Sequence, residues 1–121
     1  MKKWWMMMGI ALVFLGACNG GEEAYQTIEI SEIESYQEEG YIVVDVREKS
    51  EYEAGHIPGA MNKPLSEISN GNLDSLDPSQ PYVIVCQSGN RSKQASDSLV
   101  EADYNIVNVK QGMSSWTGSV E

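Results

Sequence analysis

Apolar and polar residues alternate along the chain in a pattern that predicts short strands separated by short helices. Residues 41–46 form a nearly continuous β-branched run, which is typical of a strand covered on both faces, so we expect this strand at the centre of the sheet. Residues 25–30, 82–85 and 105–109 are further candidate strands, and a brief one follows the Pro-Gly turn within residues 56–62. Strands that alternate with helices favour a mainly parallel sheet, with its ligand site at the carboxyl ends of the strands.

Helices are predicted from capping signals and from apolar residues at helical spacing. The runs from Ser31 to Glu34 and from Ser50 to Glu53 match the capping box, and each predicts a short helix. Glycines at positions 40 and 55 end these two helices. A longer helix is predicted over residues 92–102, one or two helical turns within residues 65–76, and a last short helix at residues 113–116.

The N-terminal 17 residues have the features of an export signal. Two lysines precede an almost wholly apolar stretch at residues 4–14, which is shorter than the ~20 residues that a transmembrane helix needs. The run from Leu15 to Cys18 resembles the bacterial lipobox, in which the cysteine is acylated and becomes the new N-terminus. We therefore expect a signal peptide over residues 1–17, a lipid on Cys18, a polar tether over residues 18–24 and one folded domain over residues 25–121. An ordinary secretory signal with a chance cysteine is the alternative.

Charge and length limit the kinds of partner. Removing residues 1–17, which carry two lysines and no acid, takes the formal net charge from −10 to −12. A chain this acidic repels nucleic acid and anionic lipid head groups, so we expect neither as a partner. The expected location is outside the cytoplasm, with the protein held on the bacterial cell membrane by its lipid. The oligomeric state is left open.

The candidate reactive group is the thiol of Cys86. It follows an apolar strand and precedes a short turn with Gly89 and then a helix. Such a turn directs backbone N–H groups and the positive end of the helix dipole at one point, where a thiolate is stabilised. The alternative is a buried core thiol, since free cysteines are often buried. No Cys-x-x-Cys pair is present, which disfavours a thioredoxin-like disulfide exchanger. One histidine, His56, and one free cysteine cannot form a typical zinc site, so no metal or cofactor is expected.

Five separated motifs stand out along the chain: residues 44–47, Glu53, residues 55–60, residues 86–92 and residues 112–116. Together they resemble the motifs of single-domain rhodaneses, and the resemblance spans residues 25–118. It implies a five-stranded, mainly parallel α/β sheet flanked by short helices, with the cysteine loop as the active site. It also implies a sulfurtransferase that moves a sulfane sulfur from a small anionic donor such as thiosulfate to a thiol, or to cyanide, through a Cys86 persulfide.

The loop after Cys86 is the expected substrate-binding segment. Arg91 is either an electrostatic stabiliser of the incoming anion or a surface arginine paired with one of the many carboxylates. Gln87 is neutral where some thiosulfate-using relatives carry a basic residue, which leaves the donor open. Asp45 either tunes the site or bonds to Arg47, and for His56 a structural role is favoured over that of a base. The loop residues are Gln87, Ser88, Gly89, Asn90 and Arg91.

Two other functions remain open at this point. Dual-specificity phosphatases of the cell-cycle type share the fold, but their loop places five residues between cysteine and arginine, whereas four separate Cys86 from Arg91. The smaller ring of amides suits one sulfur atom and crowds a phosphoryl group. A non-catalytic or redox module that binds a partner is the other alternative, although such silent domains usually lack the cysteine.

Overall fold

The computed structural model describes residues 24–121. The predicted signal peptide, the predicted lipid site Cys18 and all but the last residue of the predicted tether lie outside the described residues. Within the described part of the chain, no helix combines the length and the apolar character needed to cross a membrane.

Five parallel strands form one sheet in the order β1-β5-β4-β2-β3, which confirms the predicted architecture. The middle strand is β4, and β2 lies second from one edge, so the expectation that β2 is central was wrong. The β-branched run of β2 reflects burial on both faces, which an inner strand reaches without being the middle one. The strands are β1 Gln26–Ile28, β2 Ile42–Asp45, β3 Met61–Asn62, β4 Tyr82–Val85 and β5 Ile106–Val109.

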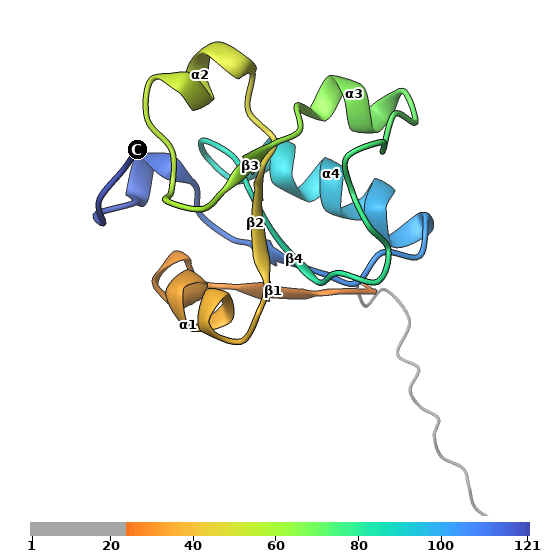
Figure 1. Ribbon diagram of the computed structural model, residues 1–121, viewed down its shortest axis with the longest axis horizontal. Coiled ribbons are helices and arrows are strands. Elements are labelled where there is room, and N and C mark those ends of the chain that lie inside the picture. The colour runs from red at the N-terminus through yellow and green to blue at the C-terminus, as the bar shows by residue number, and fades with distance from the viewer. Residues whose placement is uncertain (1–23) are drawn as a thin grey trace, which may run out of the picture.

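Helices cover both faces of the sheet and bury two apolar clusters (Figure 1). Helices α3 (Leu65–Ser69) and α4 (Asn90–Glu101) pack on one face, while α1 (Ile33–Glu38) and the 3₁₀ turn η3 (Met113–Ser115) lie on the other. Alternate residues of β4 serve the two faces, because side chains of a strand point in opposite directions in turn. Ile84 and then Cys86 join the α3/α4 cluster, and Val83 and Val85 join the α1 cluster.

The two capping boxes form two residues earlier than the sequence predicted. A 3₁₀ turn, η2 (Ile30–Glu32), precedes α1, and its box joins Glu29 to Glu32 through an N–H···Oε2 bond of 2.9 Å. Helix α2 (Lys49–Glu53) has its box at Glu48 and Glu51, with an N–H···Oε1 bond of 3.0 Å. Each observed box joins two glutamates at the same three-residue spacing as the predicted box. Because each helical turn begins earlier than predicted, Glu29 and Glu48 are the N-cap residues in place of Ser31 and Ser50.

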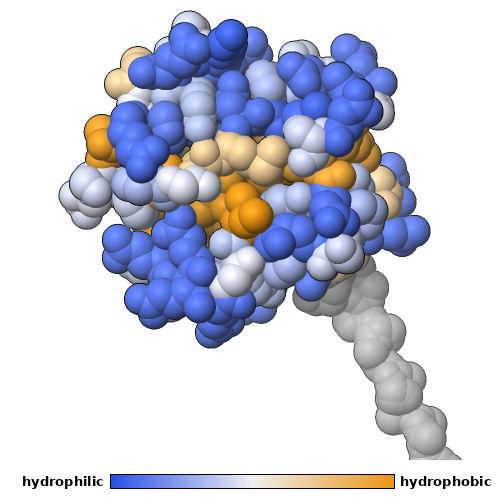
Figure 2. Space-filling view, in the orientation of Figure 1, coloured by the Kyte–Doolittle hydropathy of each residue, from blue (hydrophilic) through white to orange (hydrophobic). Residues whose placement is uncertain are grey.

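The face of the molecule seen in Figure 2 is largely hydrophilic, in agreement with the acidic composition. Figure 2 shows polar residues over most of one face, with a narrow apolar band crossing the edge of the sheet where β2 and β3 lie. Among the described residues, the exposed large hydrophobic side chains are Ile42 and Val120. Most of the remaining large apolar side chains are therefore used in the two clusters beside the sheet.

Candidate active site

The loop that joins β4 to α4 requires glycine at one position. Cys86 directly follows β4, and Gly89 is the N-cap of α4 with φ of 103°. A Cβ atom at Gly89 would collide with the carbonyl oxygen of Lys110. The positive φ and the close approach both exclude larger residues at position 89. Glycine at this position therefore allows the loop to turn tightly around the cysteine sulfur.

The Cys86 sulfur lies in a cradle of hydrogen-bond donors. The Gly89 N–H donates to Sγ over 3.0 Å. Burial raises the pKa of the Cys86 thiol, but the Ser92 hydroxyl and the N–H groups of Ser92, Gly89 and Ser88 lower it by more, so its pKa lies below the ordinary value. The N-terminus of the twelve-residue α4 adds its positive end. This arrangement stabilises an anionic sulfur without a neighbouring base.

The same sulfur is fully covered in this conformation. Cys86 is 0% exposed and belongs to the apolar cluster that contains Ala95 and Leu99. The thiol is therefore buried, as the alternative interpretation holds. On the side of the loop, however, the sulfur is next to hydrogen-bond donors and not only to apolar side chains. A reagent reaches Sγ only when the atoms that cover it are displaced.

Backbone hydrogen bonds join the segment after β5 to the cysteine loop. The Met113 N–H donates to the Cys86 carbonyl over 2.8 Å, and the Ser114 N–H donates to the Gln87 carbonyl over 3.0 Å. Gly112 lies so close to this backbone that a Cβ atom would collide with Gln87. Only the motif at residues 112–116 indicated this support, because backbone contacts between distant segments leave no periodic pattern in a sequence.

A buried ion pair links β2 to the cysteine loop. Arg47 Nη2 and Asp45 Oδ2 are 2.7 Å apart, with side-chain exposures of 6% and 1%. The guanidinium also donates to the Gly55 carbonyl over 2.8 Å and to Gln87 Oε1 over 3.2 Å. Asp45 thus bonds to Arg47, as one of the two sequence interpretations holds, and Arg47 in turn fixes the side chain of Gln87.

Arg91 forms a two-pronged ion pair with Glu51 of α2. Nη1 lies 2.7 Å from Oε1, and Nη2 lies 3.1 Å from Oε2. The hydrogen bond from Arg91 holds the pKa of Glu51 at about 2, with help from the Glu48 N–H. Of the two interpretations of Arg91, the structure shows the carboxylate pair. Glu51 was not identified from the sequence as a neighbour of the loop. Its place in the helix after β2 was a usable signal, because that helix begins at the carboxyl end of the sheet, where the loop also lies.

His56 has a structural environment. Its ring stacks on Tyr52 at a centroid distance of 3.8 Å, and Nδ1 donates to the Tyr52 carbonyl over 2.9 Å. Nε2 lies 3.6 Å from Glu121 Oε1. These contacts fix the segment after α2 against the C-terminal residues.

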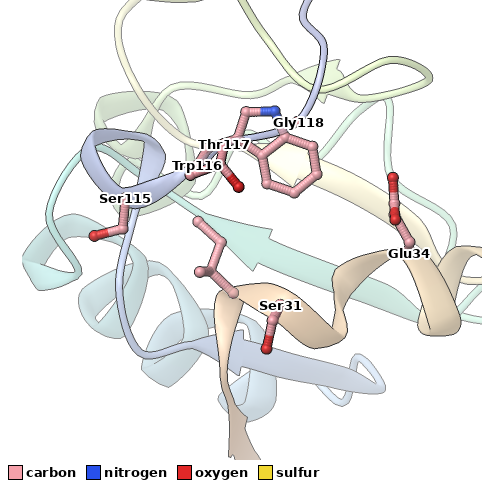
Figure 3. Close-up of a pocket in the computed structure, with 7 residues that line it drawn as sticks. Ser31, Glu34, Ser115, Trp116, Thr117 and Gly118 are labelled. Carbon is pink, nitrogen blue, oxygen red and sulfur yellow. The ribbon is translucent and has the colours of Figure 1, made fainter.

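Other chemistry-bearing features of the described residues lie apart from the loop. No group of three or more His, Cys, Asp or Glu side chains within residues 24–121 could hold a metal ion. A pocket of about 360 Å³ opens between η2 and the segment after η3, with the Trp116 ring and the Glu34 carboxylate at its walls (Figure 3). No residue of the Cys86 loop lines this pocket.

Replacing the Ser92 hydroxyl tests the cradle directly. Ser92→Ala removes the hydroxyl group that lowers the pKa of Cys86, and with it the bond of that hydroxyl to the Gly89 carbonyl over 3.2 Å, so the thiol is expected to ionise at higher pH in this variant. Thiolate absorbance in the ultraviolet, followed as a function of pH, measures the midpoint. Ser88→Ala is the matched control, because it keeps the backbone N–H through which Ser88 acts. Equal midpoints in Ser92→Ala and the unmodified protein would contradict the assigned cradle.

The parallel sheet, with a cysteine loop between its middle strand and the following helix, defines a rhodanese-like α/β domain. The chain belongs to this family: the rhodanese-like domain model matches residues 29–119. The chain is 34% identical over 112 residues to "Putative sulfur carrier protein YrkF" of Bacillus subtilis, covering 88% of this chain and 60% of that protein. It is 35% identical over 84 residues to "Putative sulfurtransferase YtwF" of the same organism, covering 69% and 81%.

The chain is also similar to one part of a longer protein and to proteins of solved structure. The chain is 31% identical to "Adenylyltransferase and sulfurtransferase UBA4" of Meyerozyma guilliermondii, covering 79% of this chain and 24% of that protein. The chain thus spans less than two thirds of both YrkF and UBA4. A rhodanese-like domain protein from Staphylococcus aureus superposes with a TM-score of 0.70 at 33% identity, covering 79% of this chain and 96% of that one. The protein SSP1007 from Staphylococcus saprophyticus gives 0.71 at 31% identity, covering 79% and 98%.

Proposed function

We propose that this protein is a sulfurtransferase that moves a sulfane sulfur from a donor such as thiosulfate to a thiol through a persulfide on Cys86. The observation that carries the proposal is the donor cradle around Sγ, in which the Gly89 N–H lies 3.0 Å from the sulfur and hydrogen bonds lower the pKa of the thiol. The names of the relatives, "Putative sulfur carrier protein YrkF" and "Putative sulfurtransferase YtwF", support the same kind of chemistry.

The proposed reaction has two half-reactions. The Cys86 thiolate attacks the outer sulfur of thiosulfate, the S–S bond of the donor breaks, and sulfite leaves with the bonding electron pair. The product Cys86–S–S⁻ carries its negative charge on the terminal sulfur, where the amides of the loop stabilise it. A thiolate acceptor, or cyanide in a test tube, then attacks that terminal sulfur and regenerates the Cys86 thiolate. A covalent intermediate of this kind predicts ping-pong kinetics.

Intact-mass spectrometry tests the proposal. The purified protein is mixed with thiosulfate, and a mass increase of one sulfur atom is expected, which a thiol or cyanide then removes. Cys86→Ser is the control, and it should show no added sulfur under the same conditions. Absence of the adduct together with hydrolysis of an aryl phosphate would contradict sulfur transfer and indicate the phosphatase alternative.

Complete burial of the sulfur favours one second candidate, a module that binds a partner without catalysis. Cys86 is 0% exposed, so a donor meets it only after a local displacement. If no donor produces an adduct and no substrate is turned over, the partner-binding function replaces the enzymatic one.

We also propose that the protein is exported and held on the cell membrane by a lipid on Cys18. The lysines and apolar run of residues 1–14 and the small residues before Cys18 support this location. Cells that express the chain are expected to incorporate a labelled fatty acid into it. The label should disappear in Cys18→Ser and persist in Cys86→Ser. An exported wild-type protein without label would contradict the lipid attachment.

A further inference from the structure

Two arginines contact or belong to the cysteine loop, and each of them is paired with a carboxylate. Arg47, which contacts Gln87, pairs with Asp45 at 2.7 Å. Arg91, inside the first turn of α4, pairs with Glu51 at 2.7 Å and 3.1 Å. Gln87 itself is neutral. Neither guanidinium therefore offers an unmatched charge to an anion that approaches the sulfur.

The ion pair with Glu51 occupies the N–H groups of Arg91 that would otherwise bind an anionic sulfur donor. Two parallel N–H···O bonds occupy one edge of the guanidinium, and this bidentate geometry is the one in which arginine also binds oxyanions. The side chains are 31% and 35% exposed, so an incoming anion can approach the pair. It then meets the Glu51 carboxylate as well as the guanidinium, and the attraction and repulsion largely cancel.

The charge of Glu51 persists over the whole physiological range. Hydrogen bonding from Arg91 holds the pKa of Glu51 at about 2, and the pKa of Arg91 is raised by the same contact. Neither partner changes its charge near neutral pH, so the cancellation is a fixed property of the site rather than a switch.

From this geometry, and resting on the proposed sulfur transfer, we infer that Glu51 sets the charge of the donor. By pairing with Arg91, Glu51 makes the loop favour donors with one negative charge or none, such as alkanethiosulfonates and organic persulfides, over dianionic thiosulfate. Glu51 is a positioning residue here: it acts on the donor through Arg91.

The two donor classes deliver the same sulfur to Cys86. With an alkanethiosulfonate, R–SO₂–S⁻, the Cys86 thiolate attacks the terminal sulfur, the S–S bond of the donor breaks, and the sulfinate R–SO₂⁻ leaves with the electron pair. With thiosulfate the leaving group is sulfite, which carries one more negative charge. The persulfide product is identical, so a difference between the donors reports on charge at the entrance to the site.

The rate of persulfide formation with each donor tests the inference. We compare thiosulfate with ethanethiosulfonate in the wild type, Glu51→Gln and Glu53→Gln. Glu51→Gln keeps an oxygen that can accept the Glu48 N–H, so the cap of α2 is retained. Releasing Arg91 from its carboxylate should raise the rate with thiosulfate relative to that with ethanethiosulfonate by about five- to tenfold at low salt. The gain should shrink as salt is added.

Glu53→Gln is the matched control. It removes the same charge from the same helix, but Glu53 pairs with Lys49 at 3.9 Å, with side-chain exposures of 62% and 79%, and not with Arg91. Its donor ratio should stay within about twofold of the wild type. A structural role of Glu51 alone would change both donors equally and leave the ratio unchanged, which would overturn the inference. If neither donor forms a persulfide in any variant, the sulfur transfer itself is contradicted.

Discussion

Asp45→Asn is expected to lower the free energy of unfolding by about 3–5 kcal/mol, because it leaves the charge of Arg47 buried without its counter-ion. The ion pair is 2.7 Å long and both side chains are almost completely covered. Asparagine keeps the shape of the side chain and one acceptor oxygen, so the loss comes from charge rather than from a cavity. Urea denaturation followed by circular dichroism measures the change.

An exposed ion pair of the same protein provides the comparison. Glu53→Gln removes a carboxylate that lies 3.9 Å from Lys49 on the surface of α2. Water screens that pair, so its loss should cost less than about 1 kcal/mol. Equal effects of Asp45→Asn and Glu53→Gln would contradict the view that the buried pair anchors the end of β2. Asp45→Asn is also expected to release Gln87, since its Oε1 bonds to the same guanidinium.

The strands were predictable because each one carries its own signal. The β-branched runs at residues 41–46 and 82–85 can be satisfied only where both faces are covered, and they became β2 and β4. Which of the two is the middle strand was not predictable. That order depends on where β3 and β5 pair, and hydrophobic pattern describes burial rather than neighbours.

The cysteine loop was predictable, but the residues that complete its surroundings were not. Gly89 and the helix after it follow Cys86 directly, so local sequence is enough to predict a turn whose amides face the sulfur. Glu51 is 40 positions from Arg91, and the chain offers many other carboxylates as partners. Only the fold selects one of them, because it places the start of α2 beside the start of α4. The support from Met113 and Ser114 is likewise a backbone contact, which leaves no periodic pattern in the sequence.

Gly89→Ala is expected to disrupt both the fold and the sulfur site. An alanine at φ of 103° costs about 1–2 kcal/mol through its backbone conformation alone. Its methyl group would also collide with the Lys110 carbonyl, and the shift that relieves this contact should cost about 1–3 kcal/mol more. The same shift moves the Gly89 N–H away from Sγ, so the pKa of the Cys86 thiol should rise and persulfide formation should slow.

Gly40→Ala separates the collision from the backbone strain. Gly40 has nearly the same φ, 101°, but no atom lies within 4 Å of the position that its Cβ would take. Urea denaturation should therefore show only the conformational cost for Gly40→Ala, and its thiol should ionise at the same pH as in the wild type. If Gly89→Ala loses no more stability than Gly40→Ala and keeps the same thiol pKa, the tight closure of the loop does not hold the sulfur. In that case the thiolate depends on Ser92, the N–H of Ser88 and the dipole of α4 instead, because these are the remaining groups that stabilise it.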